Sequence, residues 1–554
     1  MRKGSGKFFA RGIRAALAAA FAACIAVSAT GCGKRETPAE TAARNGILLV
    51  GNAADPASLD PSLATGSSEI RILRGLFEGL VRADTKTLEV RPAAAKSWTV
   101  SDDGLTYRFK IDKNAKWSDG SPVSARDFEY AWKRALNPAL GAEYASMLHA
   151  IKNARPYNAG EIGDASKVGV RAISDSELEV ELERPVPYFE SMLYHSAFFP
   201  LPRKTLEKFG ATDRRDTRWT RPENMVCNGP FTLVKWSIND KISLRANPHY
   251  RARELLKLKG ADFFPISNIN TEDRAFSAGQ LHITDSVAPS RLPAALAAAP
   301  QTVRRDKWLG VYYYLFNTRR PPLDDPRVRR ALSLSIDRRA IIDSFLKAGQ
   351  DAAGNFVPSG CGGYVPPRGE SENIALAKKL LAEAGYPDGK NFPRIRISYN
   401  TSEQHKPIAE AVQQMWRKNL GINAELFNLS WPAYLAARRE GDFDVARSSW
   451  VGDFDAPENF LDLFHSASGL NHSGYKSAEY DALLARARSA KTRPERMRLL
   501  SEAEAKMLAD APVMPIYFYS RVFRISPLVR GWDANALDYH NFLGVSLEAK
   551  GGAK

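Results

Sequence analysis

Residues 105–128 read LTYRFKIDKNAKWSDGSPVSARDF and contain a strand, a turn and the start of a helix in direct succession. Every second residue from Leu105 to Ile111 is apolar, which is the period of a strand with one buried face. The KWSDGSP segment that follows has the glycine, proline and aspartate of a turn. Ser124 and Asp127 then have the spacing of a helix capping box, so we predict a helix there.

Strands and helices alternate in the same way toward the C-terminus. Asp325-Pro326 supplies an N-cap and a first-turn proline for a further helix. A strand is predicted at 395–399 and a helix at 408–416, and Gly421 ends that helix before another strand at 422–427. The order strand, helix, strand predicts an α/β fold in which helices cover the sheets. Ligands of such folds bind beyond sheet edges or between domains.

Length and composition restrict the class of protein. The chain has 554 residues, which is too long for one hydrophobic core and predicts two or three domains. Its 44% hydrophobic and 25% charged residues are ordinary for a soluble globular protein. The formal net charge is +16, but the basic residues outside the N-terminus are mixed with acidic ones. No basic run is interleaved with aromatic residues, so we predict no nucleic-acid binding.

The N-terminus has the pattern of an export signal. Basic residues without an acidic one precede an alanine-rich apolar stretch at 15–29, and Thr30-Gly31-Cys32 follows. This pattern predicts a signal peptide at 1–31 and a lipid on Cys32, with 32–45 as a flexible tether to the membrane. Cleavage without lipidation is the alternative, whereas the apolar stretch is short for a transmembrane anchor. The mature protein is therefore expected outside the cytoplasm.

Two cysteines remain once the signal and the lipid are accounted for. Cys24 leaves with the signal peptide and Cys32 is used for the lipid, which leaves Cys227 and Cys361. An even number of cysteines in an oxidising compartment permits one disulfide. The alternative is two independent thiols, and the sequence does not decide between them.

The sequence contains none of the familiar catalytic motifs. There is no His-Glu-x-x-His, no Gly-x-Ser-x-Gly, no Walker loop and no Gly-x-Gly-x-x-Gly. Asp453, Asp455 and Glu458 lack the spacing and the central glycine of a calcium-binding loop. We therefore predict no catalytic residue, no metal site and no cofactor, and a binding protein rather than an enzyme.

Several segments together resemble the oligopeptide-binding proteins of bacterial ABC importers, in solute-binding protein family 5, which includes dipeptide, murein-peptide and nickel binders. The likeness covers the whole mature chain in order. The segments that carry it are SLDP at 58–61, LFEGL at 76–80, Ser97-Trp98, AKWSDGSPV at 115–123, Asp127-Phe128, YYY at 312–314, YNTS at 399–402, FDVAR at 443–447 and PIYFY at 515–519.

The resemblance implies a two-lobed periplasmic binding protein of the Venus flytrap type (type II, cluster C) with an extra third domain. It places lobe I at 46–77, 203–309 and 521–554, the extra domain at 78–202, and lobe II at 310–520. Crossings near 309–310 and 520–521 would act as hinges. The implied function is that of a periplasmic, lipid-anchored monomer that captures short peptides and delivers them to an ABC permease.

The resemblance also implies site residues. Asp453 matches the family's aspartate for the peptide ammonium, although by itself it reads as a turn or cap residue. The ligand backbone would pair with Thr65-Gly66-Ser67 and with a strand that includes Trp450, by strand addition. Matches to cationic positions for the peptide carboxylate are Arg447, His405, Arg438 and Arg439, and matches to pocket-lining positions are Tyr144, Tyr313, Asn400, Trp431, Tyr519 and Asn471.

Some positions depart from the family pattern. Arg439 stands where a histidine is expected, and Thr65 replaces an acidic residue. Gly310 and Val451 occupy positions that form a disulfide in some relatives. The loop at 357–366 also differs, which leaves the preferred peptide length open. The alternatives are a murein peptide, a dipeptide, a nickel complex or a non-peptide solute as ligand, and a secreted peptidase is a weaker one.

Overall fold

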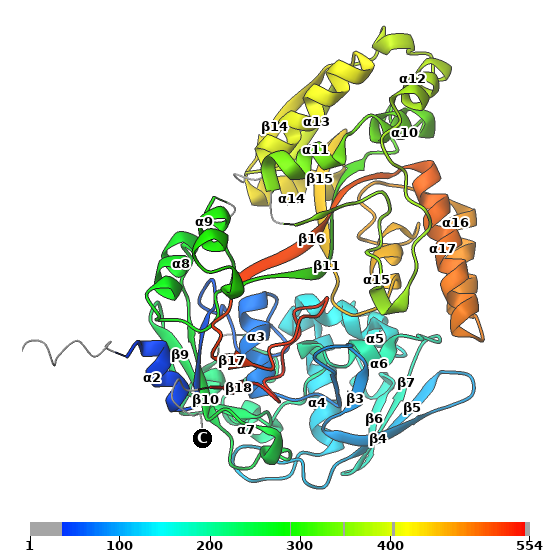
Figure 1. The fold of residues 1–554 in the computed structure, drawn as a ribbon. Coiled ribbons are helices and arrows are strands. Elements are labelled where there is room, and N and C mark those ends of the chain that lie inside the picture. Colours follow the sequence, from blue (N-terminus) through cyan, green and yellow to red (C-terminus); the bar gives the residue numbers. More distant parts are fainter. Residues whose placement is uncertain (1–35, 216, 289, 347–348, 402–404, 549–554) are drawn as a thin grey trace, which may run out of the picture.

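The computed structural model describes residues 36–215, 217–288, 290–346, 349–401 and 405–548, and the chain forms a lower and an upper part (Figure 1). The predicted signal peptide and lipidated Cys32 lie outside the described residues. Within the described ranges, no helix combines the length and apolarity that crossing a membrane requires. The same ranges contain no group of His, Cys, Asp and Glu side chains placed to hold a metal ion.

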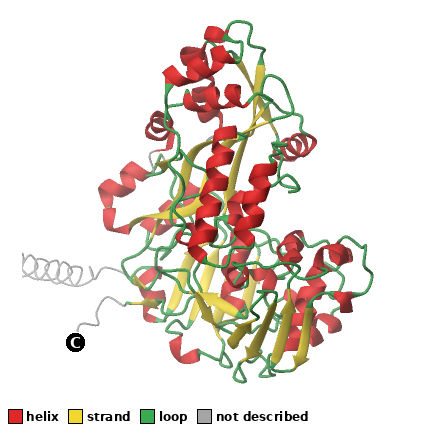
Figure 2. Ribbon diagram, turned by 90° about the vertical axis from the view of Figure 1, so that its right-hand side faces the viewer, coloured by secondary structure: helices red, strands yellow, loops and turns green. Residues whose placement is uncertain are grey.

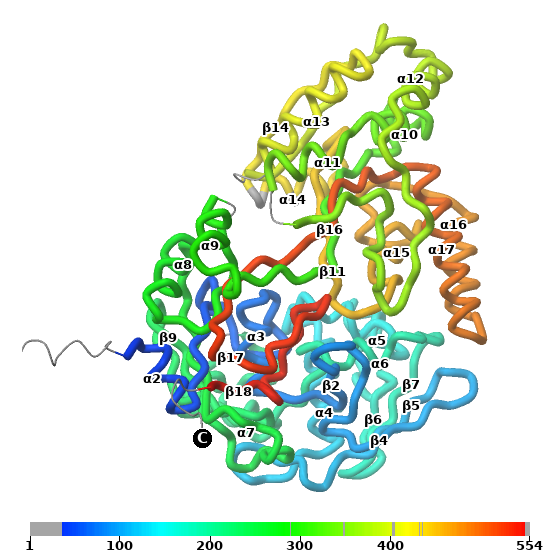
Figure 3. Tube along the Cα trace, viewed as in Figure 1, coloured from blue at the N-terminus to red at the C-terminus, as the bar shows by residue number. Residues whose placement is uncertain are grey.

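The lower part contains a mixed sheet near the N-terminus. Its strand order is β1 (Ile47–Gly51), β10 (Gly260–Phe264), β9 (Lys241–Ala246) and β8 (Phe231–Ser237). β1 pairs with β10 in parallel, and the other neighbours are antiparallel. Helix α3 (Ser67–Leu76) packs on β8. The C-terminal segment returns to this part, where Ile525 bridges to Ile283 (Figure 3).

A second, antiparallel sheet of the lower part contains the segment at 105–128. Its order is β4 (Ala95–Val100), β5 (Thr106–Ile111), β7 (Glu177–Glu181) and β6 (Val170–Ser174). The predicted strand is β5, in which Tyr107, Phe109 and Ile111 are buried. The predicted helix is α4 (Ala125–Leu136), which packs on β6 and β7. Its capping box is formed as predicted, because Ser124 and Asp127 cap each other's backbone N–H.

The upper part is built on a six-stranded sheet, with helices on its faces (Figure 2). The strands are, in order, β12 (Asp351–Ala352), β16 (Val513–Arg524), β11 (Val303–Phe316), β15 (Val445–Val451), β13 (Ile395–Asn400) and β14 (Ala424–Leu429). Helix α13 (His405–Leu420) packs on β13 and β14 and ends at Gly421, as predicted. Helix α10 (Pro326–Leu334) begins after Asp325, which caps it.

The remaining elements are short connections or cover the sheets. The helices are α2 (Pro38–Arg44), α5 (Ala154–Asn158), α6 (Phe189–Met192), α7 (Arg203–Lys208), α8 (Ile269–Ser277), α9 (Leu292–Ala298), α11 (Arg338–Ile341), α12 (Ile374–Glu383), α14 (Trp431–Glu440), α15 (Glu458–Leu461), α16 (Ala478–Arg488) and α17 (Arg493–Asp510). The remaining strands are β2 (Val81–Ala83), β3 (Val90–Pro92), β17 (Val529–Arg530) and β18 (Ser546–Leu547).

Two long antiparallel strands, β11 and β16, run from the lower part into the upper part (Figure 1). They pair from Val303 with Arg524 to Leu315 with Val513. The pairing register shifts between Lys307 and Val311, where the ladder passes from one part to the other. A break in the ladder removes hydrogen bonds that would stiffen the ribbon, so this is a position at which the two parts can change their relative orientation.

The possible disulfide between Cys227 and Cys361 is wrong, because both are free and buried. The Cys227 thiol lies in the lower part and donates to the carbonyl oxygen of Phe231 at 3.3 Å. Burial raises its pKa to about 12. Cys361 lies in a loop of the upper part, next to Asp455. The two thiols are not bonded to each other, so the second alternative, independent thiols, holds.

Candidate functional site

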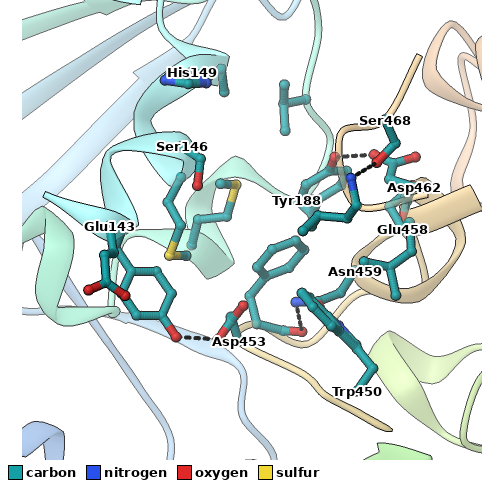
Figure 4. Close-up of a pocket in the computed structure, with 18 of the residues that line it drawn as sticks. Glu143, Ser146, His149, Tyr188, Trp450, Asp453, Glu458, Asn459, Asp462 and Ser468 are labelled. Atoms are coloured by element: carbon teal, nitrogen blue, oxygen red, sulfur yellow. Dashed lines mark hydrogen bonds between the residues drawn. The ribbon is translucent and has the colours of Figure 1, made fainter. Parts of the chain in front are cut away.

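A cavity of about 830 Å³ lies where the upper part meets the lower part (Figure 4). One wall is formed by the 3-10 helix Glu143–Ala150 and by residues 184–192 of the lower part, and the other by residues 450–470 of the upper part. Most of its surface is apolar, from side chains such as Met147, Met192 and Leu463. An apolar cavity with a few polar groups is the usual form of a ligand site.

Asp453 lies at this cavity on the segment that follows β15. The Tyr144 hydroxyl donates to its Oδ1 at 3.3 Å, across the junction of the two parts (Figure 4). Among the described residues, no cation pairs with Asp453, and burial raises the pKa of its carboxyl to about 6. A half-buried carboxylate without a cation is destabilised by desolvation, which a cationic ligand group would relieve.

The chain around Asp453 is fixed on both sides. Before it, the Gly452 N–H donates to the carbonyl oxygen of Leu309 at 2.7 Å, close to the break in the β11–β16 ladder. A Cβ at Gly452 would lie 2.7 Å from the end of the Leu309 side chain, so a larger residue there would have to displace that leucine. After it, Glu458 at the start of α15 forms a buried ion pair with Arg496, with two contacts of 2.6 and 2.7 Å. Asp453 is thus held between two rigid attachments.

Aromatic side chains form the rest of the wall next to Asp453. Phe454 stacks on Tyr188 of the lower part, with ring centroids 5.1 Å apart and planes 4° apart. The Tyr188 hydroxyl donates to Asp462 at 3.4 Å, and Asp462 is also paired with Arg488 at 2.6 Å. The Trp450 indole N–H donates to Asn459 at 2.7 Å, which fixes the indole at the cavity edge. The two parts therefore contact each other through this wall.

Arg447 is a buried cation on β15. Its guanidinium lies 4.8 Å above the ring of Tyr312 and donates to Asn400 at 3.4 Å and to the Tyr519 hydroxyl at 3.5 Å. Its Nε has no hydrogen-bond partner, and no described carboxylate pairs with it. A buried guanidinium with neutral partners alone can still accept an anionic ligand group.

The other predicted cations differ in their surroundings. His405 lies beside Tyr312, and burial together with the nearby Arg447 lowers its pKa to about 4, so it is neutral near pH 7. Arg438 lies 5.8 Å above the ring of Tyr434, and its Nε has no partner. Arg439, next to it on α14, is exposed. At neutral pH the positive charge in this region therefore comes from arginines.

The predicted site residues fall into groups. Thr65, Tyr144, Trp450 and Asp453 line the cavity. Asn400 and Tyr519 both contact Arg447 on the sheet of the upper part, outside that cavity. Ser67 is exposed at the first residue of α3. Trp431 begins α14, and its side chain is outside the described part of the structure.

Two predicted residues are occupied by structural contacts. Tyr313 is buried and its ring packs edge-on against Phe356 at 5.0 Å. Asn471 donates to the carbonyl oxygen of Tyr475 at 2.7 Å and accepts from the Ser473 hydroxyl at 2.7 Å, so it shapes a turn. Sequence reasoning missed other cavity residues, which are Glu143, Ser146, His149, Arg184, Tyr188, Phe454, Asn459 and Asp462. Of these residues, only Phe454 could have been predicted from the sequence, because it directly follows Asp453.

Two parts joined by paired strands, with a cavity at their junction, define a two-lobed solute-binding protein that carries an additional domain. Residues 89–472 match the model for the bacterial extracellular solute-binding proteins, family 5. The chain belongs to this family.

Three relatives from Escherichia coli K12 show how widely the likeness extends. The chain is 36% identical to the murein peptide-binding protein MppA over 489 residues, which cover 87% of this chain and 89% of MppA. It is 35% identical to the oligopeptide-binding protein OppA over 503 residues, 89% of this chain and 90% of OppA. It is also 35% identical to the probable deoxycholate-binding protein YgiS over 523 residues, 93% and 96% of the two chains. The solved unliganded, open form of MppA superposes with a TM-score of 0.79 at 35% identity, covering 91% of this chain and 97% of MppA.

Proposed function

We propose that this protein captures short peptides between its two lobes outside the cytoplasm and delivers them to an ABC permease. The observation that carries the proposal is a pair of opposite charges on one segment. Asp453 and Arg447 each lack a charged partner among the described residues, and five residues of nearly extended chain lie between them. A peptide is a ligand that brings an ammonium at one end and a carboxylate at the other.

The spacing of the two charges suits a short chain. An extended backbone covers at most about 3.3–3.6 Å per residue, so the α-carbons of Arg447 and Asp453 are at most roughly 20 Å apart. Both side chains reduce this distance by reaching toward the ligand. A peptide of a few residues would fit between them, with its backbone paired to β15 by strand addition. The proposed ammonium contact is Asp453 and the proposed carboxylate contact is Arg447, with Arg438 and Arg439 available to longer ligands.

The proposed domain division follows the sheets. Lobe I comprises 46–77, 203–309 and 521–554, the extra domain 78–202, and lobe II 310–520. The six-stranded sheet falls in lobe II apart from the ends of β11 and β16, and the register shift in their ladder supports hinges near 309–310 and 520–521. Closure of lobe II on the other two domains would bring the wall with Tyr144 and Thr65 onto a ligand held by Asp453.

The proposed setting is a lipid-anchored, monomeric periplasmic protein that works without catalysis or a cofactor. The sequence pattern around Cys32 supports the anchor, and the relatives named above support the location. A peptidase would need a nucleophile with a base, or a metal site. The charged groups lining the cavity beside Asp453 are instead either exposed, like Glu143, or engaged in ion pairs, like Glu458 and Asp462.

A non-peptide solute is the competing proposal, because the chain is as similar to YgiS as to OppA. Deoxycholate is a carboxylate with an apolar body and has no ammonium for Asp453. The uncompensated carboxylate in the cavity therefore favours a ligand with an amine.

Native mass spectrometry tests the proposed function directly. Protein purified without denaturation should retain peptides, and calorimetry with dipeptides through pentapeptides should give saturable binding. Deoxycholate should not compete. Retention of an amine-free solute, together with no measurable binding of any peptide, would contradict the proposal.

Peptide affinity should fall as the pH is lowered through 6. Asp453 has a pKa of about 6 in the free protein, and an ammonium binds its ionised form. The peptide ends stay charged between pH 5 and 7. Proton linkage then weakens binding by about tenfold between pH 7 and pH 5. Calorimetric titrations in matched buffers measure this change.

The variant Asp453→Asn is the control for this pH dependence. It should bind weakly, with an affinity that is nearly constant over the same pH range. Every other titratable group near the cavity is the same in both proteins, so a difference between their pH slopes belongs to Asp453. An equal pH slope in Asp453→Asn and wild type would assign the titration to another group.

A further inference from the structure

The loop at 356–364 lies directly beneath the segment that carries Asp453. It overlaps the loop at 357–366 that we predicted to differ from the family pattern, and its middle is the glycine-rich stretch GCGG at 360–363. The loop is fixed at its base by Glu504 of α17. Glu504 Oε1 accepts from the backbone N–H groups of Phe356 and Val357 at 2.6 and 2.8 Å, and its Oε2 accepts from the Tyr364 hydroxyl at 2.7 Å. One buried carboxylate thus ties the two ends of the loop together.

The base of the loop also packs against the two elements that frame the site. The Phe356 ring lies edge-on to Tyr313 of β11 at 5.0 Å and to Phe464, just beyond α15, at 5.1 Å. β11 pairs with β15, which carries Arg447, and α15 follows the Asp453 segment. The loop is therefore part of the same packed unit as both proposed ligand contacts.

The tip of the loop contacts the Asp453 segment itself, at Asp455. The Gly362 N–H donates to Asp455 Oδ1 at 2.6 Å, and the Cys361 thiol also hydrogen-bonds to this carboxylate. Arg493 of α17 donates to the Gly362 carbonyl oxygen at 2.5 Å, which holds the tip in place. From the lower part, the Tyr194 hydroxyl accepts from the Asp455 backbone N–H at 3.4 Å.

Asp455 does not line the cavity, and its side chain is used in these contacts instead. Its carboxylate points to the loop, whereas the carboxylate two residues earlier, Asp453, faces the cavity. Fixing one residue of an extended segment restricts the backbone of its near neighbours. The direction of the Asp453 carboxylate is thus determined by where Asp455 is held.

We propose that the loop at 356–364 positions Asp453 for the ligand ammonium, with Asp455 and Gly362 as the positioning residues. This inference rests on the proposed peptide-binding function and deepens it. Neither residue needs to contact the ligand. The loop instead sets how well the site discriminates a free amino terminus from a blocked one.

The matched variants Gly362→Ala and Gly360→Ala test the proposal. Both glycines have a positive φ, +53° and +84°, so alanine strains the loop backbone at either position. A Cβ at Gly362 would lie 2.9 Å from the carbonyl oxygen of Asp455, whereas a Cβ at Gly360 has nothing within 4 Å. Only the first substitution therefore pushes on the Asp453 segment.

The measurement is the ratio of the affinities for trialanine and N-acetyl-trialanine, by calorimetry. A small displacement of a charge-assisted contact has a large effect, so Gly362→Ala should lower this ratio by about tenfold. Gly360→Ala should keep the wild-type ratio, even if both variants unfold at a lower temperature. An unchanged ratio in Gly362→Ala, or an equal drop in Gly360→Ala, would overturn the proposal.

A second variant decides the matter if Gly362→Ala does not fold. Asp455→Asn keeps the shape of the side chain but removes the charge that strengthens its hydrogen bonds, so the ratio should fall several-fold. A wild-type ratio in Asp455→Asn overturns the positioning role while the proposed function stands. If wild-type protein binds neither trialanine nor any peptide in the calorimetric series, the proposed function fails, and the inference fails with it.

Discussion

Replacing Asp453 with alanine should weaken the binding of a free-amine peptide by about 2–5 kcal/mol, or roughly 30-fold to several thousand-fold. The carboxylate lies at the cavity with the Tyr144 hydroxyl as its hydrogen-bond partner, and burial keeps its pKa at about 6. In the complex, the ligand ammonium would compensate this charge, and the alanine variant would leave the ammonium desolvated without a partner. Calorimetry with trialanine measures the loss.

The stability of Asp453→Ala should equal or exceed that of the wild type at pH 7. A carboxyl whose pKa is raised by folding disfavours the folded state once the pH rises above the unfolded value near 4, so its removal relieves this cost. Chemical unfolding therefore separates a binding defect from a folding defect. Wild-type affinity for trialanine in a folded Asp453→Ala variant would remove Asp453 from the site.

Peptides with one blocked end assign the two charges separately. N-acetyl-trialanine should bind wild type and Asp453→Ala with similar, low affinity, because neither complex contains the ammonium contact. Trialanine amide should likewise bind wild type and Arg447→Ala similarly, since Arg447 is the proposed carboxylate contact. If amidation of the peptide, rather than acetylation, removed the effect of Asp453→Ala, the peptide would lie in the opposite direction in the site.

Local sequence signals predicted the individual elements well. The alternation before Ile111 predicted β5, and the pair Ser124 and Asp127 predicted the capping box of α4. Asp325 predicted the cap of α10. These features depend on neighbours within a few residues, where hydrogen-bond geometry and side-chain period are fixed by the chain itself. The family resemblance then supplied the arrangement of the lobes, which local signals do not contain.

The cavity was harder to predict because its two walls come from distant segments. Tyr188 carries no motif, and its stacking on Phe454 exists only once the lower part meets the upper part. The state of the cysteines stayed open for the same reason, since an even number says nothing about the distance between Cys227 and Cys361. Tyr313 matched a pocket-lining position of the family, but that match did not reveal that Phe356 packs against its ring.

Replacing Asp60 with alanine should destabilise the folded protein by about 3–5 kcal/mol. Asp60 accepts from both terminal nitrogens of Arg134 on α4, at 3.1 and 2.7 Å, and from the Trp219 indole at 3.3 Å. Asp60 and Arg134 are 2% and 3% exposed, so the alanine variant would leave a guanidinium buried without its counter-charge. The contact joins the segment before α3 to the helix of the second sheet. Unfolding in urea, followed by circular dichroism, measures the effect.

An exposed ion pair of the same region provides the control. Asp175 pairs with Arg126 of α4 at 2.7 Å, but their side chains are 79% and 67% exposed. Water solvates both groups after the pair is broken, so Asp175→Ala should change the stability by less than about 1 kcal/mol. The double variant Asp60→Ala/Arg134→Met should recover part of the loss, because it removes the orphaned charge as well as its partner. Similar losses in Asp60→Ala and in the double variant would mean that charge compensation is not what holds these segments together. The packing of the Arg134 side chain and its bond to the Ala211 carbonyl oxygen would then do so.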